Sequence, residues 1–168
     1  SRIMSSYKDE RRAAARVLMG PEASIVASRD TVIRMLREAL YAAKICSYAQ
    51  GFALMTMASR EYGYQLDCSA IARIWRGGCI IRARFLDDIR EAFSRNPRLV
   101  NLMIDGAFAQ AMNERQDSLR RLVSVAALSG IPVPAFASAL SYYDAYRSER
   151  LPANLTQAQR DYFGAHTY

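Results

Sequence analysis

The stretch that decides the fold runs from Ser28 to Gly63 and reads SRDTVIRMLREALYAAKICSYAQGFALMTMASREYG. Apolar residues such as Ile33 and Leu36 recur in it at spacings of three and four, which is the spacing of one helix face. Ser28 or Asp30 can cap the first turn, and no proline interrupts the pattern before Gly63. The stretch therefore predicts a single helix of about 33 residues, roughly 50 Å long.

The middle of this helix, from Ala39 to Ala58, is apolar on nearly every side. A membrane span is the rival interpretation, since it needs about 20 predominantly apolar residues. Lys44 and Gln50 would be costly at the centre of such a span. We therefore predict a central helix that other helices cover, and no membrane partner.

Shorter helices are predicted on both sides of the central one, because helix-forming segments alternate with breakers such as Gly20-Pro21 and Asn96-Pro97. Their expected spans are Ser5 to Met19, Asp67 or Ser69 to about Trp75, Ile80 to Phe93, Asp105 to just before Gly130, Pro134 through Tyr146, and Thr156 to Tyr162. No strand-like alternation, linker or repeat is visible in the sequence. The predicted fold is all-α: a compact multi-helix bundle in one domain, residues 1–168.

The charge balance does not identify a partner by itself. The chain has 23 basic and 16 acidic residues, a net charge of +7, which attracts anions in general. Its basic residues are spread from Arg2 to Arg160 among acidic neighbours, whereas nucleic-acid binders usually gather them on one face. We predict no nucleic-acid partner, and keep a basic nucleic-acid binder as an alternative.

The cysteines and the single histidine predict neither a disulfide framework nor a metal site. Cys46, Cys68 and Cys79 form no CxxC pair. Cys79 could be a nucleophile only if His166, far along the chain, served as its base, so an inert thiol is the better interpretation. Reduced thiols are the default in a cytosolic protein, and we expect a cytoplasmic location.

A glycine pair in the run WRGGCIIR, Trp75 to Arg82, has two interpretations. Paired glycines can free backbone N–H groups to cradle a phosphate, but the spacing matches neither a P-loop nor GxGxxG. The other interpretation is structural: the glycines form a turn, at Arg76 to Cys79, that lets two helices meet closely. We favour the structural one.

The carboxy-terminal stretch reads as a binding segment. It carries Arg160 and the only histidine, His166, in sequence that gives neither a core role. An exposed arginine and a disordered tail histidine are one possibility. The other is a tail that docks through apolar residues and holds a phosphate or carboxylate with its arginine and imidazole. The apolar residues available for docking are Leu151, Leu155, Tyr162 and Phe163.

Three segments in their order along the chain resemble decarboxylating 6-phosphogluconate dehydrogenases. They are ALYAAKICSYAQGF at 39–52, WRGGCIIR at 75–82 and LPANLTQAQRDYFGAHTY at 151–168. The likeness extends from about Arg2 to Tyr168. The resemblance implies the carboxy-terminal helical domain of that family, in part, built around the long central helix.

The resemblance also implies a fragment. The amino-terminal Rossmann domain that binds NADP is absent from these 168 residues, as are the lysine and the glutamate that serve as general base and acid. We therefore assign no catalytic, cofactor-binding or metal-binding residue here, and expect the isolated piece to be inactive. The family enzyme oxidatively decarboxylates 6-phosphogluconate to ribulose 5-phosphate and CO2 while reducing NADP, in the pentose phosphate pathway.

Three substrate-binding residues carry over by resemblance: Arg2, Arg160 and His166. Arg2 matches the arginine that grips the phosphate of 6-phosphogluconate from the same subunit. Arg160 and His166 match a pair that the partner subunit delivers, so the resemblance implies a homodimer with shared sites. The alternative function is a free-standing helical interaction module that kept the fold without the chemistry.

Overall fold

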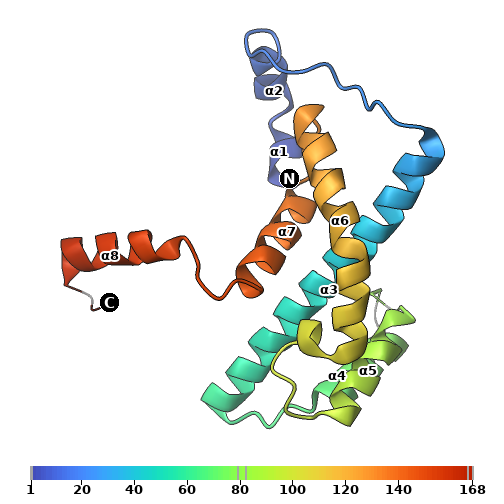
Figure 1. The fold of residues 1–168 in the computed structure, drawn as a ribbon, viewed down its shortest axis with the longest axis vertical. Helices are drawn as coiled ribbons and strands as arrows, with labels where there is room; N and C mark the ends of the chain where they lie inside the picture. Colours follow the sequence, from blue (N-terminus) through green and yellow to red (C-terminus); the bar gives the residue numbers. More distant parts are fainter. Residues whose placement is uncertain (1, 79, 82, 166, 168) are drawn as a thin grey trace.

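Helices account for all the regular structure in the described part of the chain. The structure, a computed structural model, describes residues 2–78, 80–81, 83–165 and 167, without the side chain of Arg2. The elements are α1 (Arg2–Ser6), α2 (Lys8–Ala14), α3 (Arg29–Tyr62), α4 (Cys68–Gly78), α5 (Phe85–Arg95), the 3-10 helix η1 (Leu102–Ile104), α6 (Gly106–Leu128), α7 (Pro134–Tyr146) and α8 (Ala153–Gly164). The all-α prediction is confirmed (Figure 1).

The central helix α3 forms as predicted, with 34 residues. Its amino end is capped by Ser28, whose hydroxyl accepts a hydrogen bond from the Thr31 N–H at 3.3 Å. Its carboxy end is set by Gly63, which has φ 68°, a left-handed conformation that suits a residue without a Cβ. Both ends are therefore fixed by local chemistry that the sequence displays.

The core forms where α6, α7 and η1 pack along α3 and where α4 and α5 close the other side (Figure 1). Phe52 of α3 joins α4 and α5, since its ring lies 5.3 Å from the Trp75 ring and 5.1 Å from the Phe93 ring. Phe85 of α5 lies 5.5 Å from Phe108 of α6. These buried aromatic contacts hold the helices around α3 as one body.

Three predicted boundaries are wrong. The amino-terminal helix, expected over 5–19, is split at Tyr7 and ends at Ala14, and its side chains are almost all exposed, so no packing extends it. Helix α4 continues to Gly78, so Arg76 and Gly77 are helical and not in the predicted turn. An ion pair of 2.7 Å between Arg76 and Asp87 ties this extra turn to α5, which begins at 85 and not at 80.

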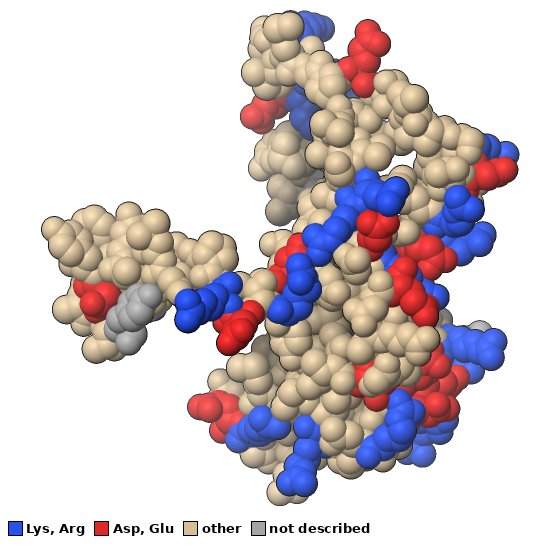
Figure 2. Space-filling model, viewed as in Figure 1, with Lys and Arg blue, Asp and Glu red and all other residues tan. Residues whose placement is uncertain are grey.

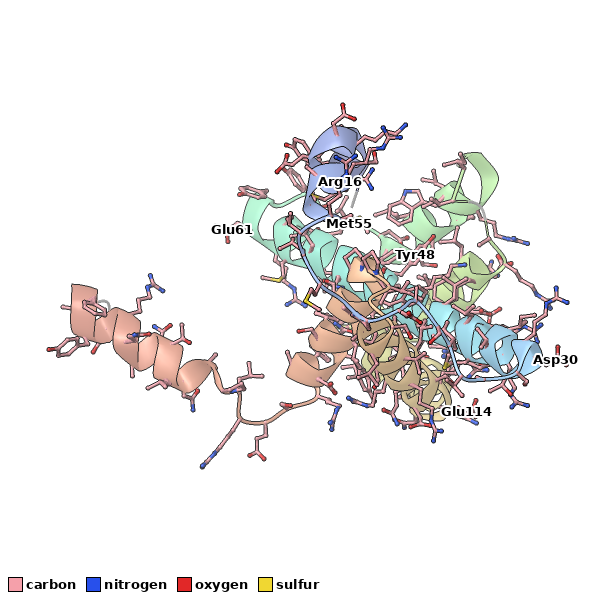
Figure 3. The ribbon with its side chains drawn as sticks, turned by 90° about the horizontal axis from the view of Figure 1, so that it is seen from above. Arg16, Asp30, Tyr48, Met55, Glu61 and Glu114 are labelled. Atoms are coloured by element: carbon pink, nitrogen blue, oxygen red, sulfur yellow. The ribbon has the colours of Figure 1, made fainter. Side chains whose placement is uncertain are left out.

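The tail helix α8 stands apart from the bundle in two perpendicular views (Figures 1 and 3). It is longer than predicted, with 12 residues, and none of them is buried. Within the body, the segment between α2 and α3 is tied to the end of α6 by a 2.8 Å hydrogen bond from the Ser129 hydroxyl to the Ser24 carbonyl. The core is thus formed by α3 to α7, whereas α2 and the tail helix α8 contribute no buried residue.

Candidate functional site

The candidate residues lie on two separate elements. Arg160 is an exposed residue of α8. Arg2 opens α1, and its side chain lies outside the described residues, as does His166 altogether. Helices α1 and α8 lie well apart in both Figure 1 and Figure 3. One copy of the chain therefore does not bring the two arginine-bearing helices together.

Helix α8 presents apolar and charged groups on different sides. Each helical residue advances by about 100°, so Leu155 and Tyr162 share a face and Arg160 points roughly 140° away from Leu155. Leu155 is 78% exposed, Tyr162 86% and Phe163 80%. Such large apolar side chains rarely stand together in water without a binding role. The arrangement lets a partner cover the apolar face while Arg160 contacts an anion.

An apolar groove runs beside α1. It has a volume of about 730 Å³ and its walls come from α1, α2, the end of α6 and the start of α7. Its lining residues include Met4, Arg11, Ala127, Ile131 and Pro134. Since Met4 and Ser5 line it, the groove adjoins the short helix that Arg2 opens.

A group of charged residues marks the place where the tail leaves the body. The Asp144 carboxylate near the end of α7 accepts hydrogen bonds from Arg120 of α6, through Nη1 at 2.8 Å and also through Nη2. It also accepts one from Arg147 Nε at 3.0 Å. Hydrogen bonding to Arg120, more than to Arg147, lowers the pKa of Asp144 to about 2.

Sequence reasoning missed this group because its key partners are distant in sequence. Arg120 and Asp144 lie 24 positions apart, so no helical spacing connects them. The only local signal is the spacing of three between Asp144 and Arg147, which occurs on many solvated helix surfaces. The pairing depends on how α6 and α7 pack.

The two described cysteines are unsuited to nucleophilic or metal chemistry. Cys46 is buried with its Sγ 3.9 Å from the Met103 Sδ, and burial raises its pKa to about 11. Burial also raises the pKa of Cys68. Both thiols stay protonated near neutral pH. Cys79, the thiol weighed from sequence, lies outside the described residues, and no group of three or more potential metal ligands occurs within them.

Basic and acidic side chains are interspersed over the body on the face that Figure 2 shows. Ion pairs join many of them, including Arg115 with Glu38 at 2.8 Å and Arg95 with Asp105 at 2.9 Å. In the part of the chain that the structure describes, no helix is long and apolar enough to cross a lipid bilayer.

The fold and the site define a class of protein: an all-α domain with an arginine-bearing helical tail that extends from its body. The chain belongs to the family described as 6-phosphogluconate dehydrogenase, C-terminal domain, whose model matches residues 1–168. The resemblance read from the sequence is thereby confirmed.

Relatives from distant organisms carry the same name. The chain is 53% identical to the decarboxylating 6-phosphogluconate dehydrogenases of Synechococcus elongatus and Rattus norvegicus, over its whole length. It is 52% identical to a Bacillus subtilis enzyme named as NADP(+)-dependent and decarboxylating. The chain spans only 35% to 36% of the length of these relatives.

A solved structure has the same fold. It is the 6-phosphogluconate dehydrogenase of Plasmodium falciparum, described in its apo form, with its cofactor NADP+ and with its substrate 6-phosphogluconate. The two superpose with a TM-score of 0.90 at 41% identity, over 99% of this chain and 36% of that one.

Proposed function

We propose that this chain is the C-terminal substrate-binding and dimerisation part of a cytoplasmic, NADP-dependent decarboxylating 6-phosphogluconate dehydrogenase. The observation that carries the proposal is the match of the whole chain, at 53% identity, to enzymes with that activity in their names. The domain that binds NADP, and the groups that exchange protons with the substrate, belong to the rest of such an enzyme. This chain supplies contacts to the substrate.

The phosphate of 6-phosphogluconate is the group that suits the candidate residues. A phosphate dianion accepts charge-assisted hydrogen bonds, and the arginine fork donates two in parallel. The phosphate lies at the far end of the sugar from the carbon that loses hydride. Arg2 and Arg160 therefore contribute binding energy that orients the sugar chain, and His166 hydrogen-bonds the substrate.

The separation of α1 and α8 supports a homodimer with shared sites. Because these helices lie apart within one copy (Figure 1), a site that uses both Arg2 and Arg160 takes one residue from each subunit. The exposed Leu155 and Tyr162 give α8 an apolar face to bury against the partner. The groove beside α1, lined by Met4 and Pro134 among others, is a surface of matching character close to Arg2.

Substitution of Arg160 tests the proposal. In the complete enzyme, Arg160→Ala removes a charge-assisted contact of about 1.5–3 kcal/mol, so the KM for 6-phosphogluconate should rise about 10- to 100-fold. The matched control is Arg150→Ala, which removes another exposed arginine of the tail. Initial rates of NADPH formation measure both. An unchanged KM in Arg160→Ala would remove that residue from the site.

An activity assay of the isolated 168-residue chain tests the proposal that the catalytic groups lie outside it. Mixed with 6-phosphogluconate and NADP, it should reduce no cofactor, since the catalytic groups lie outside it. Reduction of NADP by the chain alone would show that it holds catalytic residues of its own.

A further inference from the structure

One carboxylate joins three parts of the chain at the point where the tail begins. Asp144 lies in the last turn of α7 and receives both terminal nitrogens of Arg120 from α6. Arg120 is itself held by Gln116, whose side-chain oxygen accepts from Arg120 Nε at 2.7 Å. A bidentate arginine that is fixed on its other edge has little freedom to turn away. The Asp144 side chain is therefore pinned to α6.

The first residues beyond α7 are bound to the same aspartate. Arg147 folds back so that its Nε donates to Asp144 Oδ1 at 3.0 Å, and its guanidinium lies 5.9 Å from the Tyr143 ring centre. The Ser148 hydroxyl donates to the Asp144 backbone carbonyl at 2.6 Å. That carbonyl is one of the last four of the helix, which have no partner in the next turn. We call Arg120, Asp144, Arg147 and Ser148 the exit clamp.

For residues up to 165, the exit clamp is the last hydrogen-bonded attachment to the body that the structure describes. For residues 149–165, the hydrogen bonds to other described residues stay within the tail, for example from Gln157 Nε2 to the Thr167 carbonyl at 3.5 Å. The direction in which the chain leaves the body is therefore set at Arg147 and Ser148. Arg160 is carried by the segment whose direction is set there.

Fixing that direction has a binding consequence. A group on a tethered segment meets its target at an effective concentration that depends on the tether's stiffness and reach. When the first residues of the tether are held, fewer orientations of the tail are sampled, and more of them point the same way. Release of those residues lowers the local concentration of Arg160 at a site on another subunit without changing any contact in the site.

The ion pair of Arg120 with Asp144 differs from an ordinary surface pair. Isolated exposed pairs contribute little, because solvent screens them and the side chains lose freedom. Arg121 with Asp117 on α6 is such a pair, with side chains 71% and 60% exposed and both partners on one helix. The side chains of Arg120 and Asp144 are 35% and 36% exposed, and they link two helices and the departing chain.

We propose that Asp144 is a positioning residue for substrate binding: through the exit clamp it aims the tail so that Arg160 reaches the phosphate site of the partner subunit. The proposal rests on the proposed function, since it requires that Arg160 contact the substrate. Asp144 itself touches no substrate, and its effect passes through the direction of residues 147–152.

Steady-state kinetics of the complete enzyme test this role. Asp144→Asn should raise the KM for 6-phosphogluconate about fivefold, with kcat and the KM for NADP unchanged within about twofold. Asp144→Glu keeps the carboxylate and should restore most of the affinity. Arg147→Gln releases only the departing chain and leaves the α6–α7 pair, so it should raise the same KM. Asp117→Asn, the matched control on α6, should leave it unchanged.

The outcomes separate the two proposals. A merely structural aspartate would lower the melting temperature and kcat of Asp144→Asn while the KM stayed constant, and that result overturns the positioning role. A constant KM in Arg147→Gln also overturns it, and this variant keeps the helix pairing if Asp144→Asn folds poorly. If Arg160→Ala, measured alongside, leaves the KM unchanged, Arg160 is not part of the proposed substrate site, and the positioning role fails with that part of the proposed function.

Discussion

At the scale of single residues, the Asp144 carboxylate links stability to pH. Its pKa is lowered from 3.8 to about 2, first by the hydrogen bonds from Arg120. A carboxylate with a lowered pKa in the folded state stabilises that state above its unfolded pKa, and the contribution is lost as pH falls toward the folded pKa. The stabilisation by Asp144 is therefore complete above about pH 5 and is lost between about pH 4 and pH 2.

Comparison of the native chain with Asp144→Asn across pH checks this dependence. At pH 7 the unfolding free energy of the variant should be lower by about 1 kcal/mol. The pKa shift alone would suggest a larger difference, but the two side chains are more than a third exposed and solvent screens the pair. The difference should shrink as the pH is lowered from 5 to 3. Urea unfolding at each pH measures it, with Asp117→Asn as the control for removal of one charge. A difference that stays constant down to pH 3 would contradict the assignment.

Arg160, proposed as a substrate contact, and Asp144 of the exit clamp differ in how far the sequence indicates their roles. The sequence predicts Arg160 as a site residue because it stands in a tail that gives it no core role, and because the resemblance to the family includes it. Asp144 was not found, because its role depends on Arg120, a residue of another helix. A side chain whose partner is set by tertiary packing leaves no local pattern to read.

At the scale of helices, the boundaries predicted correctly are those with a local chemical cause. Ser28 caps α3 through its hydroxyl, Gly63 ends it with a positive φ, and Pro134 opens α7. The boundaries predicted wrongly depend on whether a helix end packs against a neighbouring helix. Helix α4 has an additional turn, and the ion pair of Arg76 with Asp87 joins this turn to α5. No local sequence pattern predicts that turn.

The cap of α6 offers a test of one such local cause. Asp105 Oδ1 accepts from the N–H groups of Ala107 at 3.1 Å and Phe108 at 3.4 Å, and its carboxylate pairs with Arg95 at 2.9 Å. Asp105→Ala leaves the first N–H groups of a 23-residue helix without this partner and should cost about 1–2 kcal/mol of unfolding free energy. Urea denaturation followed by circular dichroism measures the loss.

Two further substitutions isolate the capping effect. Asp105→Asn should retain most of the stability, because asparagine caps as well as aspartate does. Asp117→Ala, in the exposed middle of the same helix, should change stability by less than about 0.5 kcal/mol. If Asp105→Ala proves no worse than Asp117→Ala, the cap does not stabilise α6.

At the scale of the whole molecule, body and tail are stabilised in different ways. The body has a continuous core, with Phe52 and Leu119 among its fully buried side chains. The tail helix has no buried residue, and an isolated helix of about 12 residues is marginal in water. Sequence periodicity describes both as helices but does not say which of them has neighbours. The separation of α8 from α1 became visible only in the fold (Figure 3).

The apolar face of α8 should therefore be stabilised by a second copy of the chain. Burial of a leucine or tyrosine of this size contributes about 1.5–3 kcal/mol, so Leu155→Asp or Tyr162→Asp in the complete enzyme should weaken dimerisation by at least about tenfold. Asn154→Asp, which adds the same charge away from that face, is the control. Each variant should keep its helical circular dichroism, since neither side chain contributes to the core of the body.

Sedimentation velocity over a range of concentrations distinguishes the possible results. The proposal expects both apolar-face variants to dissociate at concentrations where Asn154→Asp stays dimeric, and their activity to fall in parallel with the dimer fraction, because a monomer lacks the partner's Arg160. Equal dissociation constants for all three variants would mean that α8 does not bind the partner subunit through this face. Loss of the dimer with full activity retained would mean instead that the site is complete within one subunit.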